Sequence, residues 1–524
     1  MFRACVAAVW LTLSASLAAV AASPTITPLQ QAVAQAAADD PEIVAFYRAR
    51  DFAPIWFGDG AASRRAALLE AFAAADDHGL PTDRYDATAI RDDFRAVRAT
   101  ADLGALDVEM TRRLLAYARD VSSGILEPRQ VDPTLVLDVP RPETAAVLDA
   151  FTGGDPRQAL RDLVPDAPTY VRLQREKMRL GQARRAGGWG PAVPQAKLQA
   201  GDRGPAVVAL RDRLIRMGYL PRTLSPDFDG ALDAAVRRFQ ADHGLRVDGV
   251  AGGGTIAAIN VPVEARLAQV LVGLERQRWM NRTLEDRHIL VNLAEQRAYV
   301  FDDGKVTFDT VVVIGKAAMD RRTPEFSHEM THMVVNPSWY VPRSIAVEEY
   351  LPALRRGGAR HLEVYGRRGR VNPDTVDFTR YTADTFPFSL RQPPGPRNAL
   401  GKVKFMFPNR WNIYLHDTPA KSLFDETVRT FSHGCVRVGR PFDLARHLLA
   451  AQEVDPRGTF QAALDSGRER QIDLVEPVGV HLVYWSAWVD EAGRAHYRGD
   501  PYGRDAAVRR ALAAAGVELA AGRS

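Results

Sequence analysis

Phe431-Ser432-His433-Gly434-Cys435-Val436-Arg437-Val438 is the stretch of this chain that carries the most information. It places a cysteine two residues after a histidine and two residues before an arginine. Cationic neighbours lower the pKa of a thiol and raise its thiolate fraction, so the pattern predicts a reactive cysteine. Gly434 offers no side chain that would block a substrate carbonyl, and consecutive backbone N–H groups there can form an oxyanion hole.

A second histidine lies upstream in Tyr414-Leu415-His416-Asp417-Thr418-Pro419, 19 residues before the cysteine (435 minus 416). A cysteine with a spatially adjacent histidine is the nucleophile and base pair of acyl transfer. The residue types alone do not choose between His416 and His433 as the base. Two histidines and a cysteine are also acceptable zinc ligands, but no second short-spaced ligand pair accompanies them, so a metal site is the weaker interpretation.

The N-terminus predicts export from the cytoplasm. Arg3 is followed by an uncharged stretch rich in Ala, Leu and Val that ends in small residues typical of a cleavage site. We expect residues 1–22 to be a signal peptide, although the stretch is also just long enough to remain as an inner-membrane anchor. Cleavage would remove Cys5 and leave Cys435 as the only thiol. A lone thiol is a liability in an oxidising compartment, and a buried structural cysteine is the alternative explanation for it.

Composition describes a globular protein that can bury sizeable cores. The chain has 524 residues, of which 46% are hydrophobic, and 68 Lys and Arg against 64 Asp and Glu give a net charge of +4. This length suggests about three domains. No long Lys/Arg block is present, so we predict no nucleic-acid partner.

The chain divides into segments of different pattern. Residues 28–185 are Ala-rich and mostly helical, with no sign of chemistry. A Gly/Pro linker separates them from a compact helical unit at 198–260, where Pro205 opens the first helix. Alternating apolar residues predict a mainly β domain over 288–510. Inside it lies an insertion at 343–400 that is rich in Arg, Gly and Pro. Connections of that length are often lids or binding loops, and a decorated surface excursion is the alternative.

Two of these segments resemble known families. Phe239-Gln240, Gly244-Leu245 and residues 248–255 resemble the ending of the small three-helix peptidoglycan-binding domain. The same residues are also explained by the folding of a small helical bundle and its turns. Ser432-His433-Gly434-Cys435-Val436-Arg437, preceded at this distance by His416, resembles the signature of the L,D-transpeptidase catalytic domain.

Further motifs indicate the large subfamily of L,D-transpeptidases, which joins a helical scaffold, a peptidoglycan-binding domain and a catalytic domain. Residues 414–419, 336–342 and 484–490 resemble it, and the resemblance covers nearly the whole mature chain. Asp417 stands where many family members have Gly, which excludes the short members as guides.

The resemblance implies roles for the site residues. Cys435 is the nucleophile and His416 its base, oriented by the backbone carbonyl of Asp417. His433 supports the nucleophile and Arg437 holds its loop. The full set of expected supporting or oxyanion residues is Asp417, Ser432, His433, Gly434 and Arg437, and the expected substrate-binding residues are Tyr414 and Trp339.

We therefore expect an α+β multidomain protein with a helical scaffold, a three-helix peptidoglycan-binding unit and a mainly β L,D-transpeptidase domain with a long inserted lid. The resemblance implies that the Cys435 thiolate displaces D-Ala from a tetrapeptide stem, leaving a thioester. The third-residue amine of a second stem then forms a 3-3 cross-link. Expected partners are peptidoglycan stem peptides and glycan in the periplasm, with no metal or organic cofactor. The alternatives are an L,D-carboxypeptidase or hydrolase using the same residues, and a non-catalytic wall-binding protein.

Overall fold

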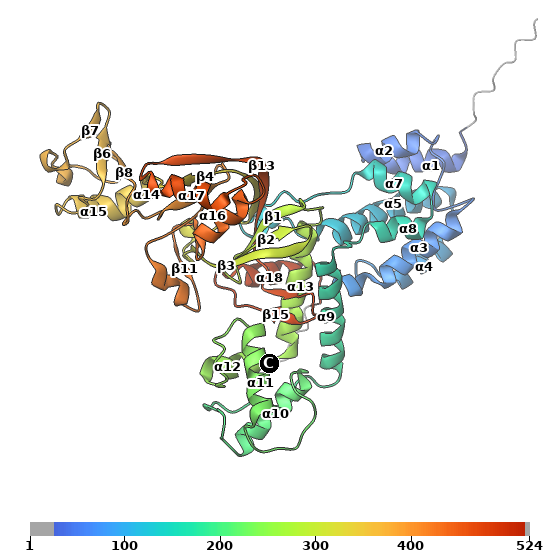
Figure 1. Ribbon diagram of the computed structural model, residues 1–524. Helices are drawn as coiled ribbons and strands as arrows, with labels where there is room; N and C mark the ends of the chain where they lie inside the picture. The colour runs from blue at the N-terminus through green and yellow to red at the C-terminus, as the bar shows by residue number, and fades with distance from the viewer. Residues whose placement is uncertain (1–25, 519–524) are drawn as a thin grey trace, which may run out of the picture.

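The computed structural model describes residues 26–518, so the expected export signal at residues 1–22 lies outside the described residues. Helices fill the N-terminal part and a sheet fills much of the C-terminal part (Figure 1), which confirms the predicted fold class. Within residues 26–518, no single helix is long and apolar enough to cross a membrane. Only α12 and α13 taken together, bent by 79°, meet the length and composition criteria.

The N-terminal helices begin where the sequence supplies caps. Thr27 forms a capping box with Gln30, and Asp40 and Asp86 accept backbone N–H groups of the first turns of α2 and α4. The helices are α1 Pro28–Ala37, α2 Pro41–Arg48, α3 Ala61–Ala73, α4 Ala87–Ala96, α5 Thr100–Ser123, α6 Pro128–Val131, α7 Thr144–Gly153, α8 Pro156–Asp162 and α9 Pro168–Arg185.

The next unit consists of α10 Pro205–Arg216, α11 Gly230–Asp242 and α12 Gly253–Ile259. Its motif residues hold a turn together. The Gln240 amide donates to Asp248 Oδ1 at 2.9 Å and to the carbonyl of Val250 at 3.0 Å. The Gln240 carbonyl oxygen in turn accepts the backbone N–H of Gly249 at 3.0 Å. Folding therefore accounts for the contacts of Gln240, which is buried.

The catalytic region is built on one nine-stranded sheet in the order β11-β3-β12-β10-β9-β4-β13-β1-β2. A further pairing of β2 with β3 closes the sheet on itself, which leaves few free strand edges. The strands are β1 Arg287–Asn292, β2 Arg297–Asp302, β3 Lys305–Gly315, β4 Phe326–Val335, β9 Val403–Met406, β10 Leu415–His416, β11 Thr430–Ser432, β12 Val436–Val438 and β13 Arg470–Val483. Helices α16 Pro441–Leu449 and α17 Pro456–Asp465 pack against it.

The insertion at 343–400 is a folded subdomain and not a loop, which differs from the expectation drawn from its composition. It contains α14 Arg343–Ile345, a π-helical turn Ala346–Tyr350, α15 Leu351–Leu354, β6 Glu363–Gly366, β7 Gly369–Val371 and β8 Ser389–Gln392. These three strands form a sheet with β5 Trp339–Tyr340, which lies just before the insertion, in the order β5-β8-β6-β7. Its own core includes Leu351, Val364, Phe378 and Leu390. The subdomain projects from one end of the molecule (Figure 1).

The C-terminal segment also differs from the prediction, which assigned residues up to 510 to the β domain. The hairpin of β14 Ala487–Val489 and β15 Ala495–Tyr497 pairs only with itself, and α18 Arg504–Ala514 follows it. Their apolar residues share one core with α9, α10 to α12 and the central helix α13 Val263–Trp279. The reason is that α13 is buried along nearly its whole length and needs partners on every side.

Candidate active site

The sheet brings the predicted nucleophile and base together. His416 ends β10, Cys435 directly precedes β12, and these two strands are parallel neighbours with Leu415 opposite Val436. Both side chains line one pocket of about 820 Å³.

The loop that carries Cys435 is held by hydrogen bonds to its backbone. Ser432 Oγ donates to the carbonyl of Cys435 at 2.5 Å and accepts the N–H of Gly434 at 3.1 Å. Gly434 has φ +118°, a left-handed conformation that favours glycine. Ser432 therefore braces the turn, and the Gly434 N–H is not free to form part of an oxyanion hole.

His416 is buried and its ring orientation is fixed. Its Nδ1 lies 2.5 Å from the carbonyl oxygen of Asp417, so Nδ1 carries the proton and Nε2 is left as an acceptor. Burial, with the nearby Arg437 charge, lowers the pKa of His416 to about 3. The imidazole is therefore neutral at ordinary pH and able to accept a proton.

Cys435 differs from the sequence prediction of a readily formed thiolate. Burial raises the pKa of its thiol to about 11, although hydrogen bonding from Tyr414 and the charges of Arg437 and Lys404 oppose this rise. Desolvation by the surrounding protein outweighs the cationic neighbours. The half-buried thiol donates to the carbonyl of Asn412 at 3.4 Å, and it needs a base to become a nucleophile.

His433 points to the insertion. Its Nε2 lies 2.6 Å from Glu349 Oε1 in the π-helical turn, and Arg321 contacts both His433, at 3.0 Å, and Glu349, at 3.2 Å. Arg321 also bonds Glu348 at 2.6 Å. This cluster joins the nucleophile loop to the subdomain at 343–400, and it commits His433 to a contact away from the thiol.

The side-chain carboxylate of Asp417 also forms hydrogen bonds, in addition to the contact of its backbone carbonyl with His416. Its carboxylate accepts the backbone N–H of Lys402 at 2.8 Å and the ammonium of Lys421 at 2.5 Å. A Cβ on Gly401, which has φ +65°, would lie 2.2 Å from Asp417 Oδ2. The carboxylate therefore fixes the segment that carries the His416-orienting carbonyl.

Arg437 is the residue that the family resemblance expects to hold the nucleophile loop. It lines the pocket, and its buried Nε has no hydrogen-bond partner among residues 26–518. Loop-holding contacts come from Ser432 and from Thr323, whose Oγ1 donates to the carbonyl of Gly434 at 2.7 Å.

The two predicted substrate-binding residues both lie at the pocket. Tyr414 packs edge to face on His416, with ring centroids 5.7 Å apart, and burial raises its pKa well above the usual value. Trp339 packs against Tyr350 of the insertion at 6.0 Å. Among the described residues, no cluster of three or more His, Cys, Asp and Glu side chains could hold a metal ion.

Sequence reasoning missed several pocket residues. Lys404 lies opposite His416 on β9, and burial lowers its pKa. Tyr350 and Glu349 reach the pocket from the insertion, and Trp411 from the loop before β10. The period-two pattern of β9 could have flagged Lys404 as a charged residue in an otherwise apolar strand, but no sequence signal placed the insertion residues here.

Three parts of the chain match known sequence families. Residues 286–457 match the L,D-transpeptidase catalytic domain, residues 203–259 a "Putative peptidoglycan binding domain", and residues 41–176 the scaffold domain. A Haemophilus influenzae protein described as "Putative L,D-transpeptidase" is 32% identical over 232 residues, which are 43% of this chain and 46% of that protein. The match thus spans less than half of the length of that curated relative.

Crystal structures of L,D-transpeptidases from Xylanimonas cellulosilytica and Stackebrandtia nassauensis align with 17% and 15% sequence identity. Each alignment covers 56% of this chain and 100% or 96% of the other, with TM-scores of only 0.19 and 0.22, too low to carry an argument. The sequence families are the stronger finding. By them, this chain carries an L,D-transpeptidase catalytic domain, with a scaffold domain and a peptidoglycan-binding domain ahead of it.

Proposed function

We propose that this protein is a cysteine-dependent L,D-transpeptidase that makes 3-3 cross-links in peptidoglycan. The observation that carries the proposal is that Cys435, just before β12, and His416, at the end of the neighbouring strand β10, line one pocket, with His416 Nδ1 fixed 2.5 Å from the Asp417 carbonyl. A neutral imidazole with its Nε2 available can take the thiol proton at the moment of attack. Because the family acts on peptidoglycan, we place the protein in the cell envelope, and we infer a periplasmic location from the signal-like N-terminus.

Acylation follows from this geometry. As Sγ of Cys435 attacks the carbonyl between the third and fourth stem residues, its proton passes to His416 Nε2. The tetrahedral intermediate then collapses, the C–N bond breaks, and D-Ala leaves with the proton from His416. The product is a thioester between Cys435 and the third stem residue.

In the transfer step, the thioester is broken by the same proton transfers in the opposite order. The side-chain amine of a second stem's third residue attacks the thioester carbonyl and gives its proton to His416. The C–S bond breaks, the new amide forms, and the thiolate recovers the proton. One cysteine in two half-reactions implies ping-pong kinetics.

The pocket lining carries charges of both signs. Arg321 lies among Asp320, Glu348 and Glu349 and is ion-paired with both glutamates. Lys404 and Arg437 are the other cations of the lining, and Trp339 and Tyr350 contribute apolar area. Guanidinium groups pair well with carboxylates, so we propose that these cations bind the stem carboxylates. Arg437, with its buried Nε unpartnered among the described residues, is the first candidate.

The test is incubation of the purified protein with disaccharide-tetrapeptides, followed by mass spectrometry. We expect release of D-Ala and cross-linked dimers, with neither in Cys435→Ala. Tripeptide products without dimers would support hydrolysis, which uses the same residues with water as the acceptor. No Cys435-dependent product from any stem would leave a wall-binding role.

A further inference from the structure

Thr323, which lies outside the sequence motifs, contacts the backbone of the loop that carries Cys435. It is fully buried in the segment before β4, and its Oγ1 donates to the carbonyl oxygen of Gly434 at 2.7 Å. Gly434 and Cys435 share that peptide group. In a planar trans peptide the C=O and N–H point in opposite directions, so a bond that fixes the carbonyl also fixes the direction of the Cys435 N–H.

The Cys435 N–H is the amide that this arrangement leaves available. The Gly434 N–H is bonded to Ser432 Oγ at 3.1 Å, and the Val436 N–H to the Tyr414 carbonyl at 3.1 Å. Within residues 26–518, the backbone N–H of Cys435 has no hydrogen-bond acceptor. It belongs to the attacking residue itself, and the trans peptide directs it away from Thr323. A substrate carbonyl attacked by Sγ develops an oxyanion that needs such a donor.

Thr323 is itself held at every polar atom. Its Oγ1 accepts the N–H of Gly315 at 3.0 Å, its N–H donates to Tyr502 Oη at 3.3 Å, and its carbonyl accepts from Arg504 at 2.8 Å. Tyr502 Oη donates in turn to the Gly315 carbonyl at 2.7 Å. The hydroxyl therefore has a single donor direction, toward Gly434.

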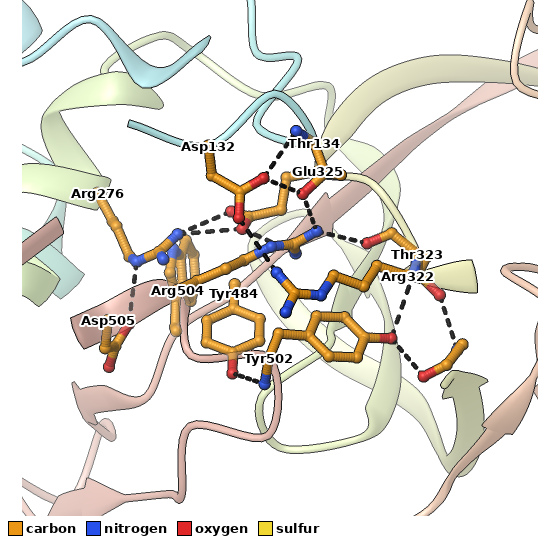
Figure 2. Close-up of polar contacts among 12 residues, drawn as sticks. Asp132, Thr134, Arg276, Arg322, Thr323, Glu325, Tyr484, Tyr502, Arg504 and Asp505 are labelled. Atoms are coloured by element: carbon orange, nitrogen blue, oxygen red, sulfur yellow. Dashed lines mark hydrogen bonds and ion pairs between the residues drawn. The ribbon is translucent and has the colours of Figure 1, made fainter. Parts of the chain in front are cut away.

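The hydrogen bonds and ion pairs that hold the backbone around Thr323 extend to residues of the scaffold region, as Figure 2 shows. Arg504 bonds Thr134 Oγ1 at 2.7 Å and Glu325 at 3.0 Å, and Arg276 bonds the same Glu325 carboxylate at 2.9 Å. The backbone of Glu325 also pairs with the segment around Thr134, with N···O distances of 3.0 Å on both sides. Arg322, adjacent to Thr323, bonds Asp132 at 3.3 Å. Residues from three distant parts of the chain thus fix the backbone around Thr323.

We propose that Thr323 is a positioning residue that aims the Cys435 N–H at the developing oxyanion, and that the scaffold segment and the C-terminal residues hold it in place. The inference rests on the proposed function, because it assigns an oxyanion donor to acyl transfer at Cys435. It gives the scaffold region a part in catalysis that its own sequence did not suggest.

The test compares two reactions of the same thiol. Acylation by p-nitrophenyl acetate forms an acetyl thioester through an oxyanion and releases nitrophenolate, whereas alkylation by iodoacetamide displaces iodide and forms no oxyanion. We expect Thr323→Val to lower the acylation rate constant about tenfold or more, since losing one oxyanion donor outright typically costs about 10²- to 10³-fold. The alkylation rate at pH 10 should stay within about twofold of the wild type. Thr323→Ser, which keeps the hydroxyl, should restore acylation.

Tyr502→Phe provides a gentler variant if Thr323→Val does not fold, because it keeps the ring and removes only the hydroxyl that anchors Thr323. We expect a smaller but still selective loss of acylation. Unchanged acylation in the variants that fold, or equal losses in both reactions, would overturn the proposal. A wild-type protein that reacts with p-nitrophenyl acetate but with no stem peptide would refute the proposed function and not this inference.

Discussion

The raised pKa of Cys435 predicts how the rate of its alkylation depends on pH. The structure raises its pKa from 9.0 to about 11, a difference of about 2 units or about 2.7 kcal/mol against the thiolate. At pH 7 the thiolate fraction falls from about 1% to about 0.01%. Iodoacetamide reacts with the thiolate, so its rate should rise nearly tenfold per pH unit up to about pH 10, where an ordinary thiol has already levelled off.

Acylation should behave differently, because in the proposed mechanism His416 is the base. With its pKa lowered to about 3, His416 is neutral over the whole working range, and neither partner ionises between pH 5 and pH 9. The acylation rate by a stem peptide should therefore be nearly flat there. His416→Ala should lower the rate by about 10²- to 10⁴-fold and make it rise about tenfold per pH unit, because only preformed thiolate can then attack.

Time courses of intact mass measure both reactions, and His433→Ala is the matched control. Since His433 contacts Glu349 and not the thiol, this variant should keep the flat profile. An alkylation rate that levels off by pH 7 to 8 would show a preformed thiolate and imidazolium pair and refute the neutral pair. If His416→Ala kept a fast acylation rate that did not depend on pH, while His433→Ala lost acylation, His433 and not His416 would be the base.

Three further predictions concern the insertion, the His416 support and acid stability. Glu349→Gln weakens the contact of Glu349 with His433 and Arg321. Backbone amide hydrogens of Ala346–Tyr350 should then exchange faster, and product analysis should show more hydrolysis relative to cross-linking. Unchanged hydrogen exchange in this segment would argue against a lid. Gly401→Ala should destabilise the fold by about 1–3 kcal/mol in urea unfolding, because φ is +65° and the added Cβ would meet Asp417; a neutral effect would contradict the role of that carboxylate. The pKa of buried His78 is lowered from 6.5 to about 4, so the unfolded state binds more protons and stability falls as pH drops through this window. Between pH 7 and pH 4, the free energy of unfolding in urea should fall by up to about 3 kcal/mol less in His78→Gln than in the wild type. An equal fall in both proteins would disprove the lowered pKa of His78.

Local signals in the sequence predicted the helical regions and the reactive pair. The helix that begins at Pro205 has its apolar face on Val207, Leu210 and Leu214, all of them buried. One short motif identified Cys435, the residue types left His416 and His433 open as its base, and the family resemblance selected His416; all three side chains line one pocket. Such features depend on residues that are near one another in the chain.

Features that depend on distant residues were not predictable. The insertion looked like a loop because its strands are short and pair across long gaps, with Trp339 opposite Gln392. The terminal hairpin was assigned to the β domain, yet Tyr497 bonds Glu176 of α9 at 2.6 Å. Thr323 gave no signal at all, since its role arises only from a contact with Gly434 more than a hundred residues later.

The raised pKa of Cys435 also bears on the difficulty that a lone thiol would pose if the protein is exported, as we propose. Oxidation acts mainly on the thiolate, so a cysteine activated by permanent cationic neighbours would be exposed to damage in an oxidising compartment. In the proposed mechanism, desolvation holds Cys435 as a thiol until a substrate is present and His416 accepts its proton during attack. Activation is thereby confined to the reaction itself, and the same desolvation that slows alkylation protects the nucleophile between turnovers. On this argument a substitution that opens the pocket to water should make Cys435 easier to oxidise.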